Sequence, residues 1–388
     1  MTTTRSELGS VREAALYVAF EIGAREWKLA VTTGMDRAPW VRTVASGDVR
    51  AVGRVLAQAR ARWGVPPGAA VHSCYEAGRD GFWIHRALIA LGLCNRVVDS
   101  SSIEVNRRAR RTKTDRLDAI KLVLMLVRVC LGEARVWQEV RVPAVADEAA
   151  RQRSRERTAL VKERTRVRNQ IDSWLATWGC RVSTAARRRA EWWTTAQDWQ
   201  GAALPQTVQD RLARAEARRA LLAEQIATLD AAQAAVVAAE PRDSALGRLV
   251  ALRGVATTSA TVLLEEGLIW RQFRNRREIG GLLGFTPARY NSGTRERDQG
   301  ITRAGNSALQ AVSIQLAWNW VRWQPSSALT QWYQTQFGHH GRARRVGIVA
   351  LARKLVIALW RYATTGMVPA GGDPHSDAES ISAGAGAS

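Results

Sequence analysis

Two acidic residues, Asp115 and Asp118, lie three positions apart in a segment, residues 112–128, whose apolar residues recur with helical spacing. Positions three apart share one face of an α-helix, so the two carboxylates are expected to lie close together. Adjacent carboxylates repel unless a cation compensates them, and Mg²⁺ binds through carboxylate oxygens together with substrate phosphates. The spacing therefore predicts a metal site, although an ordinary solvated helix with acid–arginine pairs explains it equally well.

A basic run precedes the acidic pair and suits a phosphate backbone. Its members are Arg107, Arg108, Arg110, Arg111 and Lys113. The chain of 388 residues has 57 Lys and Arg against 35 Asp and Glu, a formal net charge of +22, which favours a polyanionic partner. The sequence has no run of about 18 apolar residues, so no membrane span is predicted. Residues 1–13 lack the apolar segment of a secretory signal. We expect a cytoplasmic protein without a membrane partner.

Further acids fall on predicted strands of a layered domain. Alternating apolar residues predict strands over 16–22, 25–33, 69–75 and 95–98, with helices over 47–63 and 81–91. Strands alternating with helices indicate an α/β fold. Glu21 lies on the first strand and Glu76 ends a later one, where active sites of open α/β sheets gather.

Four acids from three elements are thus expected to converge: Glu21, Glu76, Asp115 and Asp118. Phosphodiester chemistry commonly uses two metal ions about 4 Å apart, held by such carboxylates. Each acid taken singly is also explained as a structural residue. Asp99, after the next strand, is an alternative ligand.

The second half of the chain has a helical pattern. Residues 147–178 are rich in Arg and Glu, and residues 212–236 carry apolar residues at a 3-4 spacing that Arg219 and Gln233 interrupt. This predicts an antiparallel coiled-coil arm, or alternatively an intramolecular helical bundle. Residues 284–303 are polar and glycine-rich, which predicts a functional loop. Helices are expected over 307–323 and 346–362.

Six short segments, taken together in this order, resemble a known family. They are 18–22 (VAFEI), 75–78 (YEAG), 113–119 (KTDRLDA), 283–287 (LGFTP), 290–293 (YNSG) and 300–306 (GITRAGN). Over nearly its whole length the chain resembles the DEDD insertion-sequence transposases of the IS one-ten group, which are RNA-guided and serine-recombinase-like. Glu21 departs from the family pattern, which typically has Asp there, and its longer side chain changes the reach of the carboxylate.

The resemblance implies an α/β plus α-helical protein with three parts. An RNase H-like (RuvC-like) catalytic domain would span 15–142, a helical coiled-coil region 143–240, and a C-terminal transposase domain with a serine 241–368. Residues 1–14 and 369–388 would be disordered ends, in keeping with the Gly, Ser and Ala composition of the tail.

The resemblance also implies a mechanism and partners. The four acids would hold Mg²⁺, and Ser292 would attack a DNA phosphodiester to form a covalent intermediate. A serine hydroxyl needs activation for this role, and nearby arginines would neutralise phosphate charge. Those arginines are Arg289, Arg295, Arg297 and Arg303. Donor and target DNA, a structured guide RNA and other copies of the chain, as a dimer or tetramer, would be the partners.

Two other functions fit the same residues. A Holliday-junction-type metal-dependent nuclease would use the four acids and water, and Ser292 would then lie in an ordinary Ser-Gly surface turn. A non-catalytic nucleic-acid-binding protein would use the acids only as structural residues.

Overall fold

The computed structural model describes residues 14–103, 114–268, 270–292, 295–301, 305–338 and 341–374, with the side chains of 101, 287–299 and 342 left aside. The chain divides into two compact units between Pro143 and Ala144. Together they confirm the predicted class of a mixed α/β and α-helical protein.

The first unit contains a five-stranded sheet with the order β3-β2-β1-β4-β5. Its strands are β1 (Leu16–Ile22), β2 (Glu26–Thr32), β3 (Trp40–Ala45), β4 (Val71–Glu76) and β5 (Cys94–Val98). The pairs β1–β2 and β2–β3 are antiparallel, whereas β1–β4 and β4–β5 are parallel. The four predicted strands are confirmed. The edge strand β3 was not predicted, because only Val44 among its residues is buried and no clear alternation results.

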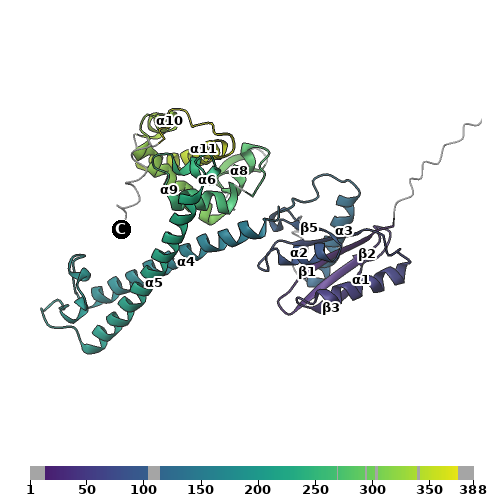
Figure 1. Ribbon diagram of the computed structural model, residues 1–388, viewed down its shortest axis with the longest axis horizontal. Coiled ribbons are helices and arrows are strands. Elements are labelled where there is room, and N and C mark those ends of the chain that lie inside the picture. The colour runs from purple at the N-terminus through teal and green to yellow at the C-terminus, as the bar shows by residue number, and fades with distance from the viewer. Residues whose placement is uncertain are drawn as a thin grey trace, which may run out of the picture. The chain divides into compact units, whose positions relative to one another are not determined.

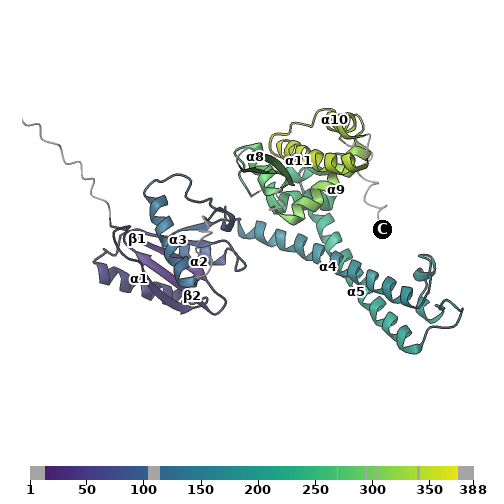
Figure 2. The ribbon, with the colours of Figure 1, turned by 180° about the vertical axis from the view of Figure 1, so that it is seen from behind.

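Helices cover both faces of this sheet. On one face, α1 (Val49–Trp63) and α2 (Trp83–Ala90) pack on the alternate apolar residues of β1, Leu16, Val18 and Phe20. On the other face lies α3 (Asp115–Cys130), packed against Ala19 and Cys74 through Ala119 and Leu122 (Figure 2). Because successive residues of a strand point to opposite faces, this contact defines which strand residues face α3.

The second unit begins with two long helices that lie side by side (Figure 1). These are α4 (Val145–Thr177) and α5 (Gln206–Ala239). Ion pairs of Arg157 with Asp230 and of Arg218 with Glu163 give an antiparallel pairing, with apolar contacts such as Ile171 and Leu212 between the helices. We call this pair, with the connection 178–205, the arm.

A polar residue on α5 has a specific partner. Gln233 is buried and its Nε2 donates to Thr261 Oγ1 at 3.0 Å. The interruption of the apolar spacing at Gln233 is therefore the place where α5 contacts the C-terminal core. By length and composition alone α5 is the one helix in the described ranges that would suffice to cross a membrane, with a mean hydropathy of 1.2 in an 18-residue window. Core helices pass the same test, and α5 packs along α4.

The remainder of the second unit is a helical core with one hairpin. Its helices are α6 (Ala245–Val250), α7 (Thr257–Leu263), α8 (Arg276–Leu282), α9 (Ser307–Trp323), α10 (Ala328–Phe337) and α11 (Gly341–Thr365), and a π-helical turn, Leu264–Leu268, continues α7. The fully buried Trp320, Leu351 and Leu355 lie in its apolar centre.

The expected loop over 284–303 was wrong in its structure, because much of it forms an antiparallel hairpin. Its strands are β6 (Pro287–Ser292) and β7 (Arg295–Ile301), which form a two-stranded sheet with each other among the described residues. Both are polar in sequence, so neither shows the apolar alternation that identifies a half-buried strand.

The chain after α11 is also more structured than its composition predicted. Residues 369–374 were expected in the disordered tail, but Ala370 O accepts from Ala328 N at 3.0 Å. The Gln324 carboxamide donates to Asp373 O and accepts from Asp373 N, both at 2.8 Å. A buried side chain that pairs with both backbone groups of one residue fixes this segment, and composition gives no sign of it.

Candidate functional site

The parallel ladder between β1 and β4 brings two acids together. Phe20 pairs with Tyr75, so the next residues, Glu21 and Glu76, lie beside each other on neighbouring strands. Glu21 lies two residues after Ala19, and Glu76 two residues after Cys74. Side chains two residues apart on a strand share a face, so both acids belong to the face that α3 covers. Glu21 is half-buried and Glu76 is exposed.

The other two acids lie in the first turn of α3. Thr114 is the N-cap, and its hydroxyl accepts from Leu117 N at 3.4 Å. Asp115 is exposed and Asp118 is half-buried. Negative charge at a helix N-terminus is stabilised by the helix dipole, so both acids also have a local structural role. α3 thus presents them from the element that covers the face of Glu21 and Glu76.

A closed set of metal ligands is not formed by these acids. Among the residues that the structure describes, all four acids included, no three His, Cys, Asp or Glu side chains are grouped so as to hold a metal ion. Their carboxylate oxygens are nevertheless the ligand type that Mg²⁺ prefers. Asp99, the alternative ligand, directly follows β5, and its N–H donates to Gln138 O at 2.9 Å. The basic run 107–113 lies outside the described residues.

The predicted nucleophile lies in the second unit, at the end of the hairpin. Ser292 is the last residue of β6 and pairs with Arg295, the first of β7. In the same ladder Arg289 pairs with Asp298, and Arg297 with Tyr290. Their side chains, and Arg303 altogether, lie outside the description. The four acids belong to the first unit, so the two sets of predicted residues fall in different units.

Two glycines close the base of the hairpin. A Cβ built on Gly305 would lie 2.4 Å from Gly284 N, and one on Gly284 would lie 2.8 Å from Gly305 N. Gly284 also has φ +64°, a conformation that favours glycine. Next to them, Asn306 N donates to Leu282 O at 2.9 Å. The two chain segments that enter and leave the hairpin therefore touch through their backbones.

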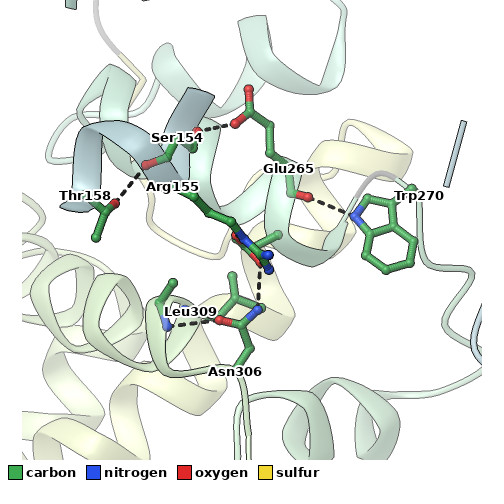
Figure 3. Close-up of polar contacts among 9 residues, drawn as sticks. Ser154, Arg155, Thr158, Glu265, Trp270, Asn306 and Leu309 are labelled. Atoms are coloured by element: carbon green, nitrogen blue, oxygen red, sulfur yellow. Dashed lines mark hydrogen bonds and ion pairs between the residues drawn. The ribbon is translucent and has the colours of Figure 1, made fainter. Parts of the chain in front are cut away.

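A buried carboxylate, that of Glu266, contacts Asn306 beside this base; Figure 3 shows the side chains of Arg155 and Asn306, which both donate to it, pointing toward each other. Glu266, in the π-helical turn, is 2% exposed and accepts two hydrogen bonds from Arg155 of α4, at 2.6 and 3.0 Å. A third comes from Asn306 Nδ2 at 2.8 Å. The Asn306 side chain also caps α9, because its Oδ1 accepts from Ala308 N and Leu309 N at 2.9 and 3.1 Å.

Glu266 and its neighbour Glu265 have opposite electrostatic environments. Burial acts to raise the pKa of Glu266, but the hydrogen bonds from Arg155 and Asn306 outweigh it and the pKa is lowered. Burial raises the pKa of Glu265, which accepts a hydrogen bond from Ser154. The backbone oxygen of Glu265 accepts from Trp270 Nε1 at 2.8 Å. Both successive carboxylates thus contact α4, from a π-helical turn of the kind often found at functional sites.

This network was not predicted from the sequence. Glu265 and Glu266 stand out as two adjacent acids in the segment 259–268, which has no other charged residue, and that was the available signal. Arg155 gave none, because it is one of many arginines in α4 and lies 111 positions before its partner.

Comparison with known proteins agrees with the motifs. Residues 247–332 match the model of the transposase IS116/IS110/IS902 family, a segment that includes Glu266, Ser292 and Asn306. The chain is 36% identical over 385 residues to the putative transposase y4rJ of Sinorhizobium fredii, covering 95% of each chain. It is 25% identical over 243 residues to the transposase for insertion sequence element IS1328 of Yersinia enterocolitica, covering 62% of this chain and 70% of that protein.

A similarity of this extent defines the class of protein as a DNA transposase of an insertion sequence. The chain belongs to the IS116/IS110/IS902 family, as the resemblance in its sequence predicted.

Proposed function

We propose that this transposase cleaves and rejoins DNA strands at specific sites, with Ser292 as nucleophile and Glu21, Glu76, Asp115 and Asp118 as ligands of Mg²⁺. The observation that carries the proposal is the adjacency of Glu21 and Glu76 on the sheet face covered by α3, the helix that begins with the two aspartates. The strand order, with three antiparallel strands followed by two parallel ones, supports an RNase H-like fold for the first unit.

In the proposed reaction, Ser292 Oγ attacks the phosphorus of a DNA phosphodiester and loses its proton. The bond from phosphorus to one deoxyribose oxygen breaks, and that oxygen leaves as a hydroxyl. A phosphodiester between Ser292 and DNA remains. Attack by the hydroxyl of another strand then reverses the exchange, so the number of phosphodiester bonds is conserved. Mg²⁺ bound by the carboxylates would stabilise negative charge on phosphate oxygens.

The hairpin base is proposed to position the nucleophile. Ser292 is held by a two-stranded ribbon, and an isolated ribbon is only marginally stable in water. The glycine contact, the Asn306 cap and the buried Glu266 join the ribbon's ends to α4, α9 and the π-helical turn. These groups act on Ser292 through the backbone, as positioning residues.

Donor and target DNA, a structured guide RNA and further copies of the chain are the proposed partners, in the cytoplasm. The formal net charge of +22 supports a nucleic-acid partner. Exchange between two duplexes needs several active sites, which supports an oligomer.

Capture of a covalent adduct tests the proposal. The full-length protein, purified with its bound RNA, is incubated with labelled donor DNA and Mg²⁺, and the products are separated under denaturing conditions. We expect a protein–DNA adduct with the wild type and with the matched control Ser326→Ala, whose serine is exposed on another segment, and none with Ser292→Ala. Sequencing of the bound RNA tests the guide: absence of a specific RNA contradicts that part alone.

A metal-dependent nuclease is the second candidate. It is favoured by the location of all four acids in one unit without Ser292, because such a site would need only water as nucleophile. If Ser292→Ala retains full DNA cleavage and no adduct forms with the wild type, the nuclease replaces the serine mechanism.

A further inference from the structure

A basic cavity lies in the arm, between α4, α5 and the connection 178–205. Its volume is about 330 Å³, within the range of small-ligand sites. Four arginines line it: Arg168, Arg187, Arg188 and Arg219. Glu216 is the acid among the lining residues, so the wall carries a surplus of positive charge.

Two of the arginines are fixed as parts of the wall. Arg187 donates to Asp172, and its guanidinium lies 5.6 Å from the centre of the Trp192 ring. Arg219 donates to Glu216, a buried residue, at 2.5 Å. These ion pairs hold both guanidinium groups in place without the need for a bound anion.

The other two arginines have weaker internal partners. Arg168 is 74% exposed and its nearest acid, Asp172, is 4.0 Å away. Arg188 is exposed, and no ion pair joins it to an acid within the described part of the chain. Exposed pairs such as that of Arg168 contribute about 0–1 kcal/mol, so neither side chain is held by a strong internal ion pair. Both are available to a ligand.

The surroundings of the cavity suit a nucleic acid rather than a small anion alone. Arg181 and Arg189 of the connection are exposed, and so are Trp178 and Trp199, the latter by 75%. Guanidinium groups pair with phosphate oxygens in a bidentate manner, and exposed aromatic rings are surfaces on which bases stack. Figure 1 shows this connection at the end of the arm away from the C-terminal core.

We propose that the arm cavity binds the phosphodiester backbone of a nucleic acid, with Arg168 and Arg188 as direct phosphate ligands. Neither Ser292 nor any of the four acids lines this cavity, and the site gives the arm a role in holding nucleic acid.

The proposed phosphate contacts are tested by measuring how the affinity for nucleic acid depends on salt concentration. The full-length protein is titrated into a fluorescent DNA duplex and, separately, a fluorescent RNA hairpin, in EDTA so that no cleavage occurs. The variant is Arg168→Gln with Arg188→Gln. The matched control is Arg166→Gln with Arg214→Gln. These two exposed arginines lie on α4 and α5 and do not line the cavity. Both doubles remove the same charge.

For the cavity variant we expect affinity to fall on the order of ten-fold near physiological salt for at least one nucleic acid. The slope of log K against log salt should decrease in magnitude by about 1 to 2, one for each lost phosphate contact. The control should keep its slope. The nucleic acid whose binding is weakened, DNA or RNA, is identified as the source of the phosphate.

Equal losses of affinity and slope in the two doubles, or no loss in either, overturn the proposal. Thermal melting of both doubles checks that the arm is folded, and little change is expected because all four arginines are exposed. Since the assay needs no catalysis, its failure leaves the serine mechanism untouched, and a negative adduct test leaves the cavity untouched.

Discussion

The carboxylates of the two units differ in what surrounds their charge. In the second unit, Glu266 is buried and receives hydrogen bonds from Arg155 and Asn306. In the first unit, Glu76 and Asp115 are exposed and Glu21 and Asp118 half-buried, on elements that share one sheet face. A buried carboxylate with a charged partner stabilises structure, whereas more exposed carboxylates keep contact with solvent, where divalent cations are found. Four predictions test this difference between the two units.

The largest expected effect is on activity, from Glu76→Gln. The proposed metal site loses one charged ligand, so the rate of DNA cleavage should fall on the order of 10³-fold. Because Glu76 is exposed, the free energy of unfolding should change by less than about 0.5 kcal/mol. Cleavage rates and urea unfolding measure the two quantities. Asp36→Asn, in an exposed turn of the same unit, is the control and should retain activity. Normal cleavage by Glu76→Gln would remove Glu76 from the site.

The next effect is on stability, from Arg155→Ala. Glu266 would keep its burial but lose its charged partner, which should lower the free energy of unfolding by about 3 kcal/mol. Arg218→Ala breaks the exposed pair with Glu163, which joins α5 to α4, and should cost about 0–1 kcal/mol. Urea titrations of both variants test the difference. Equal costs would mean that the burial of Glu266 has no energetic consequence.

A smaller loss is expected at the hairpin base, from Gly305→Ala. The added methyl would lie 2.4 Å from Gly284 N, and relief of this overlap should cost about 2 kcal/mol. Gly281→Ala is the control, because nothing lies within 4 Å of its Cβ and alanine favours a helix by up to about 1 kcal/mol. Thermal melting compares them, and the adduct assay shows whether Ser292 is displaced. A Gly305→Ala protein as stable as the control would contradict the close contact.

The smallest effect is a dependence on pH. The pKa of Glu266 is lowered, so its stabilisation is present above the ordinary value of 4.5 and is lost as pH falls through the folded pKa. The stability advantage of the wild type over Glu266→Gln should therefore shrink in acid.

Glu265 should behave in the opposite way. Its pKa is raised, so its contribution is present below 4.5 and is lost as pH rises through the folded pKa. Glu265→Gln should therefore gain stability relative to the wild type as pH rises through that range. Urea titrations from about pH 3 to about pH 7 follow both differences. Parallel curves for the two variants would show that the neighbouring carboxyls share one environment.

Local patterns predicted the elements whose faces differ in polarity. Leu16, Val18 and Phe20 alternate with polar or small residues because one face of β1 meets α1 and α2. The hairpin of Ser292 and the edge strand β3 have no such difference, so periodicity did not identify them. The acids were predicted as candidates from strand ends and helix spacing, and their roles remain predictions.

Contacts between residues far apart in the sequence could not be predicted from local residue patterns. Arg155 meets Glu266, and Gln324 meets Asp373, across 111 and 49 positions. No local sequence feature of either residue in these pairs predicts its partner. Sequence spacing predicts which residues share a face of one element, whereas these contacts depend on how elements pack together.

The contact of Gly284 with Gly305 also has a use in protein engineering. The two glycines are natural cut points, because they lie at the two ends of the hairpin segment and touch through their backbones. We expect the segment between them to be exchangeable as a cassette with that of a related transposase, provided that both glycines and Asn306 are kept. Such chimaeras would separate what the serine hairpin contributes to target choice from what the rest of the chain contributes.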